Sequence, residues 1–173
     1  MADKILGETD NLNYCIEQAK ILNNQKDIAY LESLTNSVET EQMISPRNYV
    51  RKYGGAARQI DETKDILEGI LFNPEYNLLD TIKHFLGILR FQDRLMKNQS
   101  ESPITHLVQN VNIPIYFIMG KYDHMTSTKA AKEYFDQIHA PNKEFIIYEN
   151  SAHYPQLEEK EIFYEWVCST FAN

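Results

Sequence analysis

Apolar residues recur at helical spacing through the first part of the chain. The pattern predicts helices at about 12–22, 27–34, 46–53, 60–72 and 78–96, with polar, glycine or proline breaks between them. Pro46 suits the first helical position, where its missing N–H costs nothing, and Asp10 is a plausible cap for the first helix. We expect residues 8–98 to be a run of about five amphipathic helices whose apolar stripes are mostly core.

Two short apolar runs follow a polar connector at 99–110. Residues 115–119 and 145–148 show no alternation with polar residues, which is typical of strands buried on both faces of a parallel sheet. Pro114 is tolerated at the start of the first strand, and Gly120 at its end lets the chain turn.

Helical patterns lie between and after these strands. Thr126 or Ser127 can cap a helix with an apolar face at 130–138, and a last helix is expected from 157 or 158 to 171. Ile162 is expected to be among the residues of this last helix that pack inward. A right-handed crossover through the first of these helices makes the two strands parallel.

An acidic residue and a histidine stand just beyond the two predicted strands. Asp123 follows the first strand and His153 follows the second. The loops after parallel strands open at the carboxyl edge of the sheet, where α/β proteins place their sites. The sequence therefore predicts a candidate acid–base pair at this edge.

Composition narrows the function classes. The chain has 173 residues, 43% hydrophobic residues and a formal net charge of −8. This acidic balance argues against nucleic acid or an anionic membrane as partner, because both require basic surface. Cys15 and Cys168 lack metal-ligand or C-x-x-C spacing, so we expect buried free thiols. No signal peptide or long apolar run is seen, and a cytoplasmic location is expected.

The last third of the chain resembles the carboxyl-terminal part of α/β-hydrolases, in particular proline-iminopeptidase-like bacterial hydrolases. The motifs are Gly120-Lys121-Tyr122-Asp123 after one apolar strand and Ser151-Ala152-His153-Tyr154-Pro155 after the next. The resemblance implies that Asp123 is the triad acid and His153 the general base, in the chain order Ser…Asp…His. It also implies that the helices before the strands form a lid.

The chain departs from that family in one large respect, because the nucleophile is absent. The serine requires a strained turn with the pattern G-x-S-x-G, and none of the six glycines frames a serine in this way. The early strands and the oxyanion-hole loop are missing too. We therefore expect a hydrolase fragment that is inactive alone.

The expected fold class is α/β, mostly helical, as an incomplete α/β-hydrolase fold. It divides into a helical lid at 1–98, a connector at 99–110 and a β-α-β-α part at 111–173. Two apolar strands leave open edges, so we expect a partner: the missing amino-terminal half, or a second copy of the chain. The expected substrate is a small ester, amide or short peptide, with no cofactor and no metal.

Plainer interpretations stay open. Taken without its context, Asp123 is compatible with a turn residue whose side chain makes a local hydrogen bond. His153 is in the same way compatible with an exposed loop histidine. His124 is expected to be a solvated neighbour of Asp123, and His84, His106 and His139 are expected to be structural or surface residues. The alternative function is a non-catalytic helical binding module.

Overall fold

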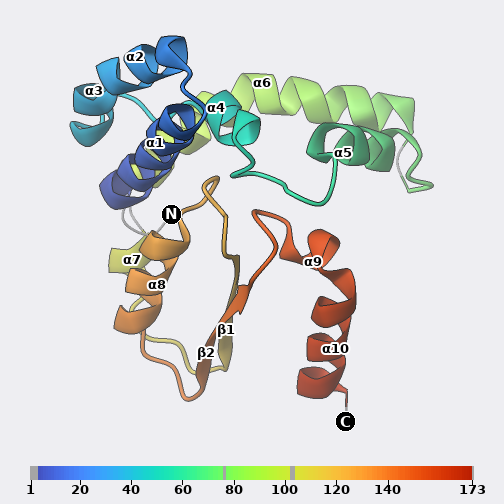
Figure 1. Cartoon of the computed structure of the whole chain (residues 1–173). Helices are drawn as coiled ribbons and strands as arrows, with labels where there is room; N and C mark the ends of the chain where they lie inside the picture. Colours follow the sequence, from blue (N-terminus) through green and yellow to red (C-terminus); the bar gives the residue numbers. More distant parts are fainter. Residues whose placement is uncertain (1–3, 76, 102–103, 173) are drawn as a thin grey trace.

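The computed structural model describes residues 4–172 except 76 and 102–103. In this part of the chain most residues are helical, and two short strands form a parallel sheet, consistent with the α/β class (Figure 1). The helices are α1 (Lys4–Ile21), α2 (Gln25–Ser33), α3 (Thr35–Glu39), α4 (Arg47–Lys52), α5 (Glu62–Leu71), α6 (Leu78–Glu101), α7 (Ile104–Leu107), α8 (Thr128–Gln137), α9 (Pro155–Glu158) and α10 (Lys160–Phe171). The strands are β1 (Ile115–Gly120) and β2 (Lys143–Tyr148).

Helices α1 to α4 pack around a small hydrophobic core. Its buried members are Leu12, Cys15, Ile16, Ala19, Leu31, Val38, Val50 and Tyr53. The apolar stripe predicted for the first helix is therefore confirmed as a core face from Leu12 to Ala19, but its last member, Leu22, is 66% exposed. Burying each large aliphatic side chain here stabilises the fold by about 1.5–3 kcal/mol.

The predicted start of the first helix is wrong. α1 begins at Lys4, so Asp10 lies inside the helix and is not its cap. The inward positions of the extra turns are Gly7, Glu8 and Asn11, all buried. Because these residues are not apolar, no hydrophobic stripe indicates this part of the helix.

Local signals placed most other helix ends within about two residues, but α6 continues past the predicted end at 96 to Glu101, and α3 was not predicted. Asn24 caps α2 by accepting from the Asp27 N–H, and Ser127 caps α8 by accepting from the Ala130 N–H. Pro46 is the N-cap of α4 and not its first residue. The region 99–110, expected as a connector, includes the end of α6 and the short helix α7; residues 102 and 103 lie outside the described part.

The two strands pair in parallel, with Ile115 opposite Lys143 and Gly120 opposite Tyr148. Helix α8 connects them along one side, and α10 lies on the other side of the sheet in Figure 1. The carboxyl ends of both strands point toward the helical body, where the loops after them meet α1 and the segment that follows α4.

Each face of the sheet has aromatic partners. On the α8 face the ring centroid of Phe135 lies 5.4 Å from that of Phe117 and 5.3 Å from that of Phe145. On the other face Trp166 of α10 lies 5.4 Å from Tyr116. Yet most strand side chains stay partly exposed, so the predicted burial on both faces is incomplete. Two strands with one helix on each side do not enclose a core.

The last helix is not continuous. α9 ends at Glu158, and α10 begins at Lys160 after Glu159 adopts φ −126° and ψ 51°. Ile162, expected to pack inward, is 54% exposed, so that prediction is wrong for this residue.

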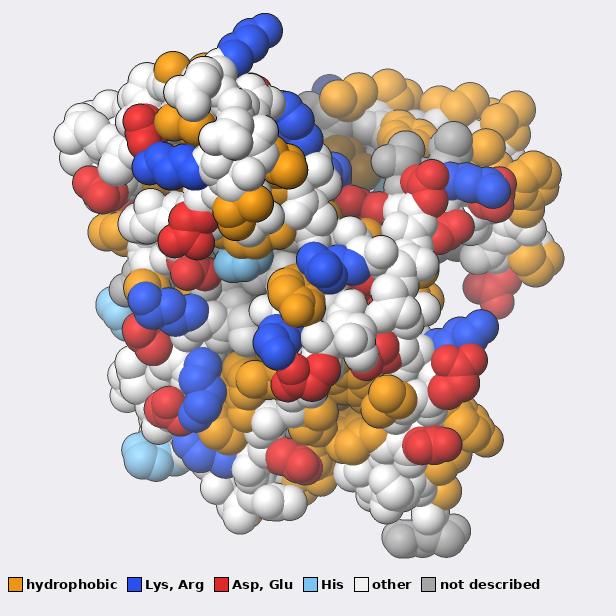
Figure 2. All heavy atoms as spheres, viewed as in Figure 1, with side chains coloured by type: hydrophobic (Ala, Val, Ile, Leu, Met, Phe, Trp, Pro, Cys, Tyr) orange, Lys and Arg blue, Asp and Glu red, His pale blue; other side chains and the backbone are white. Residues whose placement is uncertain are grey.

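Helices α5 and α6 project from the helical body as a separate pair (Figure 1). Figure 2 shows hydrophobic side chains gathered over this end of the molecule. The exposed residues are Leu71, Leu78, Leu79, Ile82, Phe85, Leu86, Ile88, Leu89 and Phe91. The expectation that helical stripes are mostly core is wrong here, and an exposed apolar patch of this kind is typical of an interaction surface.

Candidate functional site

Asp123 lies in the turn after β1 and is only 4% exposed. Its Oδ1 accepts hydrogen bonds from the Met125 and Thr126 N–H groups, both at 2.9 Å. Its Oδ2 accepts from the Thr126 hydroxyl at 2.8 Å. The carboxylate thus makes the local turn bonds that the plainer interpretation predicts, and they hold it in one orientation.

His153 lies in the turn after β2, and its side chain meets Asp123. His153 Nδ1 is 2.9 Å from Asp123 Oδ2, with side chains 32% and 4% exposed respectively. The main-chain N–H of His153 donates to the Ala56 carbonyl at 2.9 Å. The structure therefore brings together the two site residues that the sequence suggests, although 30 positions separate them.

The environment favours the charged form of this imidazole. The hydrogen bond that His153 donates to Asp123 raises the pKa of His153 above its ordinary value, and burial opposes this rise. The carboxylates of Asp123 and Glu62 raise this pKa further, and Arg47 lowers it. A bond between Nδ1–H and a carboxylate selects the tautomer whose Nε2 accepts a proton. Within the described part of the chain Nε2 has no hydrogen-bond partner. The arrangement can act as an oriented base.

Gly120 allows the two loops to approach each other. A Cβ at this position would lie 1.9 Å from the Ala152 carbonyl oxygen and 2.6 Å from that of Ser151. The sequence suggested that Gly120 serves a turn, but the structure requires a glycine for the close approach of two backbones.

The segment 55–59, between α4 and α5, touches both site loops. The Gly55 carbonyl accepts from the His124 N–H at 2.9 Å, beside the Ala56–His153 bond described above. The N–H groups of Arg58 and Gln59 donate to the Glu158 carboxylate at 2.7 and 3.0 Å. Sequence reasoning missed this segment, because backbone donors and acceptors leave no trace in a residue pattern.

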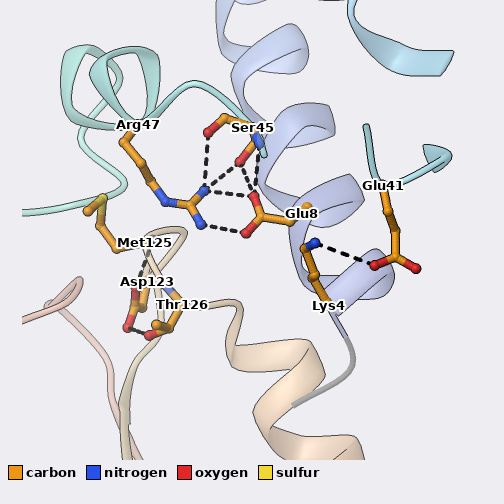
Figure 3. A network of polar contacts seen from close by, with 8 residues as sticks. All are labelled: Lys4, Glu8, Glu41, Ser45, Arg47, Asp123, Met125 and Thr126. Carbon is orange, nitrogen blue, oxygen red and sulfur yellow. Dashed lines mark hydrogen bonds and ion pairs between the residues drawn. The ribbon is translucent and has the colours of Figure 1, made fainter. Parts of the chain in front are cut away.

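A buried ion pair lies beside the Asp123 turn. Arg47 donates to both carboxylate oxygens of Glu8, at 2.6 and 3.0 Å, and Ser45 donates its N–H and hydroxyl to Glu8 Oε2 at 2.9 and 2.8 Å. Figure 3 shows this network next to Met125 and Asp123. It ties α1 to the start of α4 directly above the candidate site.

The prediction for His124 is wrong. Its ring stacks on Tyr14 with centroids 3.8 Å apart and planes at 11°, and its side chain is 19% exposed. Nδ1 is buried without a hydrogen-bond partner and lies 3.7 Å from Asp10 Oδ2. Burial lowers the pKa of His124, so its neutral form is favoured and it packs as an aromatic ring.

Neither cysteine joins the site. Cys15 is buried in the helical core, where burial raises its thiol pKa to about 12, and Cys168 is half-buried; both are free. In the residues that the structure describes, no cluster of His, Cys, Asp or Glu could hold a metal ion. His84 lies on α6, His106 on α7, and His139 pairs in a bridge with Asn110.

An open groove lies next to the candidate pair. It has a volume of about 470 Å³ and is lined by Gly54, Ala57, Arg58, Gln59, Tyr122 and Asn150. The Arg58 guanidinium stacks over the Tyr122 ring at 3.9 Å from its centroid. Tyr122 and Asn150 come from the two loops that carry Asp123 and His153, and the other four lining residues come from 54–59.

Comparison with known proteins gives one significant match among curated sequences. Over 112 residues the chain is 30% identical to a protein named probable aminopeptidase YbaC, from Bacillus subtilis (strain 168). The match covers 64% of this chain and 35% of that protein, so this chain spans about a third of the length of the relative it matches. No family model matches, and no solved structure matches significantly. Among the described residues, no helix has the length and apolar character needed to cross a membrane.

Proposed function

We propose that this chain is the carboxyl-terminal part of a serine hydrolase with the α/β-hydrolase fold, related to aminopeptidases. It supplies the acid and the base of a Ser-His-Asp triad, and the serine belongs to a polypeptide segment outside this chain. The substrate class is a small ester, an amide or a short peptide. The chain by itself is inactive, because it holds no nucleophile elbow.

The observation that carries the proposal is the 2.9 Å contact between His153 and Asp123 at the carboxyl ends of two parallel strands. In the proposed mechanism His153 Nε2 takes the serine proton and later returns it to the leaving group. Asp123 holds the Nδ1–H tautomer and stabilises the imidazolium that forms. Its bonds to the Met125 and Thr126 N–H groups keep it from turning away.

Two further findings support the fragment interpretation. The similarity to a probable aminopeptidase extends over 35% of that protein, which leaves room there for the rest of a hydrolase fold. A two-stranded sheet with partly exposed side chains is marginal alone and accepts further strands at its edge. We propose that its partner is the missing half, with a second copy of the chain as the alternative. We place the assembled enzyme in the cytoplasm.

Reactivity toward a fluorophosphonate probe tests this proposal. The chain alone is expected to stay unlabelled. Joined to the part of the Bacillus relative that lies outside the matched region, it is expected to be labelled on serine and to hydrolyse aminoacyl p-nitroanilides. His153→Ala in the same chimera should abolish both. A folded chimera that neither labels nor hydrolyses would contradict the proposal.

A second function is favoured by a different observation. The apolar side chains exposed on α5 and α6 suit a helical binding module in which the Asp123–His153 pair has no chemical role. The same His153→Ala variant separates the two functions, because a module keeps its full function without the imidazole.

A further inference from the structure

We propose that Glu158 is a positioning residue for His153. Its carboxylate fastens the turn that carries the histidine to the segment 55–59 of the helical region. The inference rests on the proposed function, because only a histidine that transfers protons needs its ring held in one orientation.

Glu158 bridges two distant parts of the chain. It is 7% exposed, and its Oε1 accepts from the Ala152 N–H at 3.0 Å. Its Oε2 accepts from the N–H groups of Arg58 and Gln59 at 2.7 and 3.0 Å. These donors lie about 100 positions earlier in the sequence, so one side chain joins the helical region to the histidine turn.

The bridge lies directly beside His153. Ala152 is the preceding residue, and the His153 N–H itself donates to the Ala56 carbonyl at 2.9 Å. The two successive peptide groups that lead into His153 are thus both held, the first through the Ala152 N–H and the second through the His153 N–H. Rotation of either peptide would swing the imidazole away from Asp123, and the Glu158 carboxylate and the Ala56 carbonyl oppose that rotation.

The bridge requires a carboxylate. Two oxygens accept N–H groups from two different segments, and a glutamine offers one accepting oxygen and places an NH₂ group against donors. In the described part of the chain Glu158 has no ion pair with a cation, so the backbone N–H groups provide its stabilisation. A buried charge held only by main-chain donors is costly to keep for a simple turn.

The neighbouring carboxylate, that of Glu159, makes a different set of contacts. Glu159 accepts from the Asn150 N–H at 3.0 Å and from the Ser151 hydroxyl at 2.6 Å. These contacts are all within the turn after β2. Glu158 differs because it reaches the segment 55–59, which also borders the groove beside the site.

The test measures the His153 ring directly in the 173-residue chain by ¹⁵N NMR. In Glu158→Gln the contact between His153 and Asp123 is expected to loosen, which lowers the His153 pKa by at least about half a unit and mixes the two tautomers. The other charges that face His153, those of Glu62 and Arg47, are unchanged by the substitution.

Two control variants separate positioning from general effects. Glu161→Gln removes the same charge from an exposed side chain on α10, and Leu31→Ala destabilises the distant helical core. Both are expected to leave the His153 pKa and tautomer as in the wild type. A Glu158→Gln variant that does the same would overturn the inference.

A measurement on the wild type covers the case in which Glu158→Gln does not fold. The amide protons of Ala152, Arg58 and Gln59 should be protected from hydrogen exchange, because one buried carboxylate accepts all three. Exchange of these amides at the rate of an open loop would overturn the bridge.

Activity gives the second readout. In the chimera with the nucleophile segment, Glu158→Gln should lower kcat by about 10- to 100-fold and change KM little, as expected for misplacement of a reacting group. An inactive wild-type chimera would count against the proposed function alone, since the NMR result on His153 does not depend on it.

Discussion

Replacement of Gly120 by alanine tests whether the close approach of two backbones sets the Asp123–His153 geometry. Ordinary van der Waals contact begins at 3.4 Å, and the new Cβ would lie 1.9 Å from the Ala152 carbonyl oxygen. The histidine turn must therefore retreat by the difference between these distances, about 1.5 Å. Both crowded atoms belong to the backbone, so no rotamer change relieves the clash.

This displacement has two expected consequences. Overpacking of this kind lowers the free energy of unfolding by about 1–3 kcal/mol. A shift of more than about 1 Å also breaks the Asp123–His153 contact, which should reduce the activity of the reconstituted hydrolase by about 100-fold. Urea unfolding measures the first effect, and the ¹⁵N signals of His153 with probe labelling measure the second.

The chain offers matched controls for Gly120→Ala. Gly69 on α5 and Gly87 on α6 have nothing within 4 Å of the place that an alanine Cβ would occupy. Alanine at either helical site is expected to raise the free energy of unfolding by about 0.5–1 kcal/mol. The reasoning is refuted if Gly120→Ala unfolds within about 0.5 kcal/mol of the wild type and keeps the His153 pKa unchanged.

Three further predictions concern the stability of the fold. Glu8→Gln leaves Arg47 without its buried counter-charge and should lower the free energy of unfolding by about 3–5 kcal/mol in urea titrations; a loss below about 1 kcal/mol would contradict this. Because Asp123 raises the pKa of His153, their pairing should stabilise the fold fully below about pH 6.5 and lose this effect as the pH rises through the raised pKa. The difference in the free energy of unfolding between wild type and Asp123→Asn should thus become smaller from acid to alkaline pH. A difference that grows over this range would contradict the prediction. Leu31→Ala should cost about 2–5 kcal/mol in thermal or urea unfolding, because Leu31 is fully buried, and a near-neutral result would show that the helical core is loose.

Short-range rules were enough to predict the elements that carry the site. Both strands and the helix between them follow from apolar runs and capping preferences that act within a few residues, although these left Thr126 and Ser127 as equal candidates for the cap that Ser127 provides. The positions of Asp123 and His153 follow from the same rules, because parallel strands joined by a crossover end at one edge of a sheet.

Contacts between distant segments decided the rest, and no periodicity encodes them. Glu8 and Glu158 look like ordinary surface acids in the sequence, yet each is buried against donors that only the folded chain brings near. His124 reads as a solvated neighbour of Asp123 until Tyr14 of α1 stacks on it. The apolar stripe of α6 predicts a core face, but a stripe states only that a helix needs a partner. Whether that partner lies in the same chain depends on three-dimensional packing, and here the described part of the stripe, up to Phe91, is exposed.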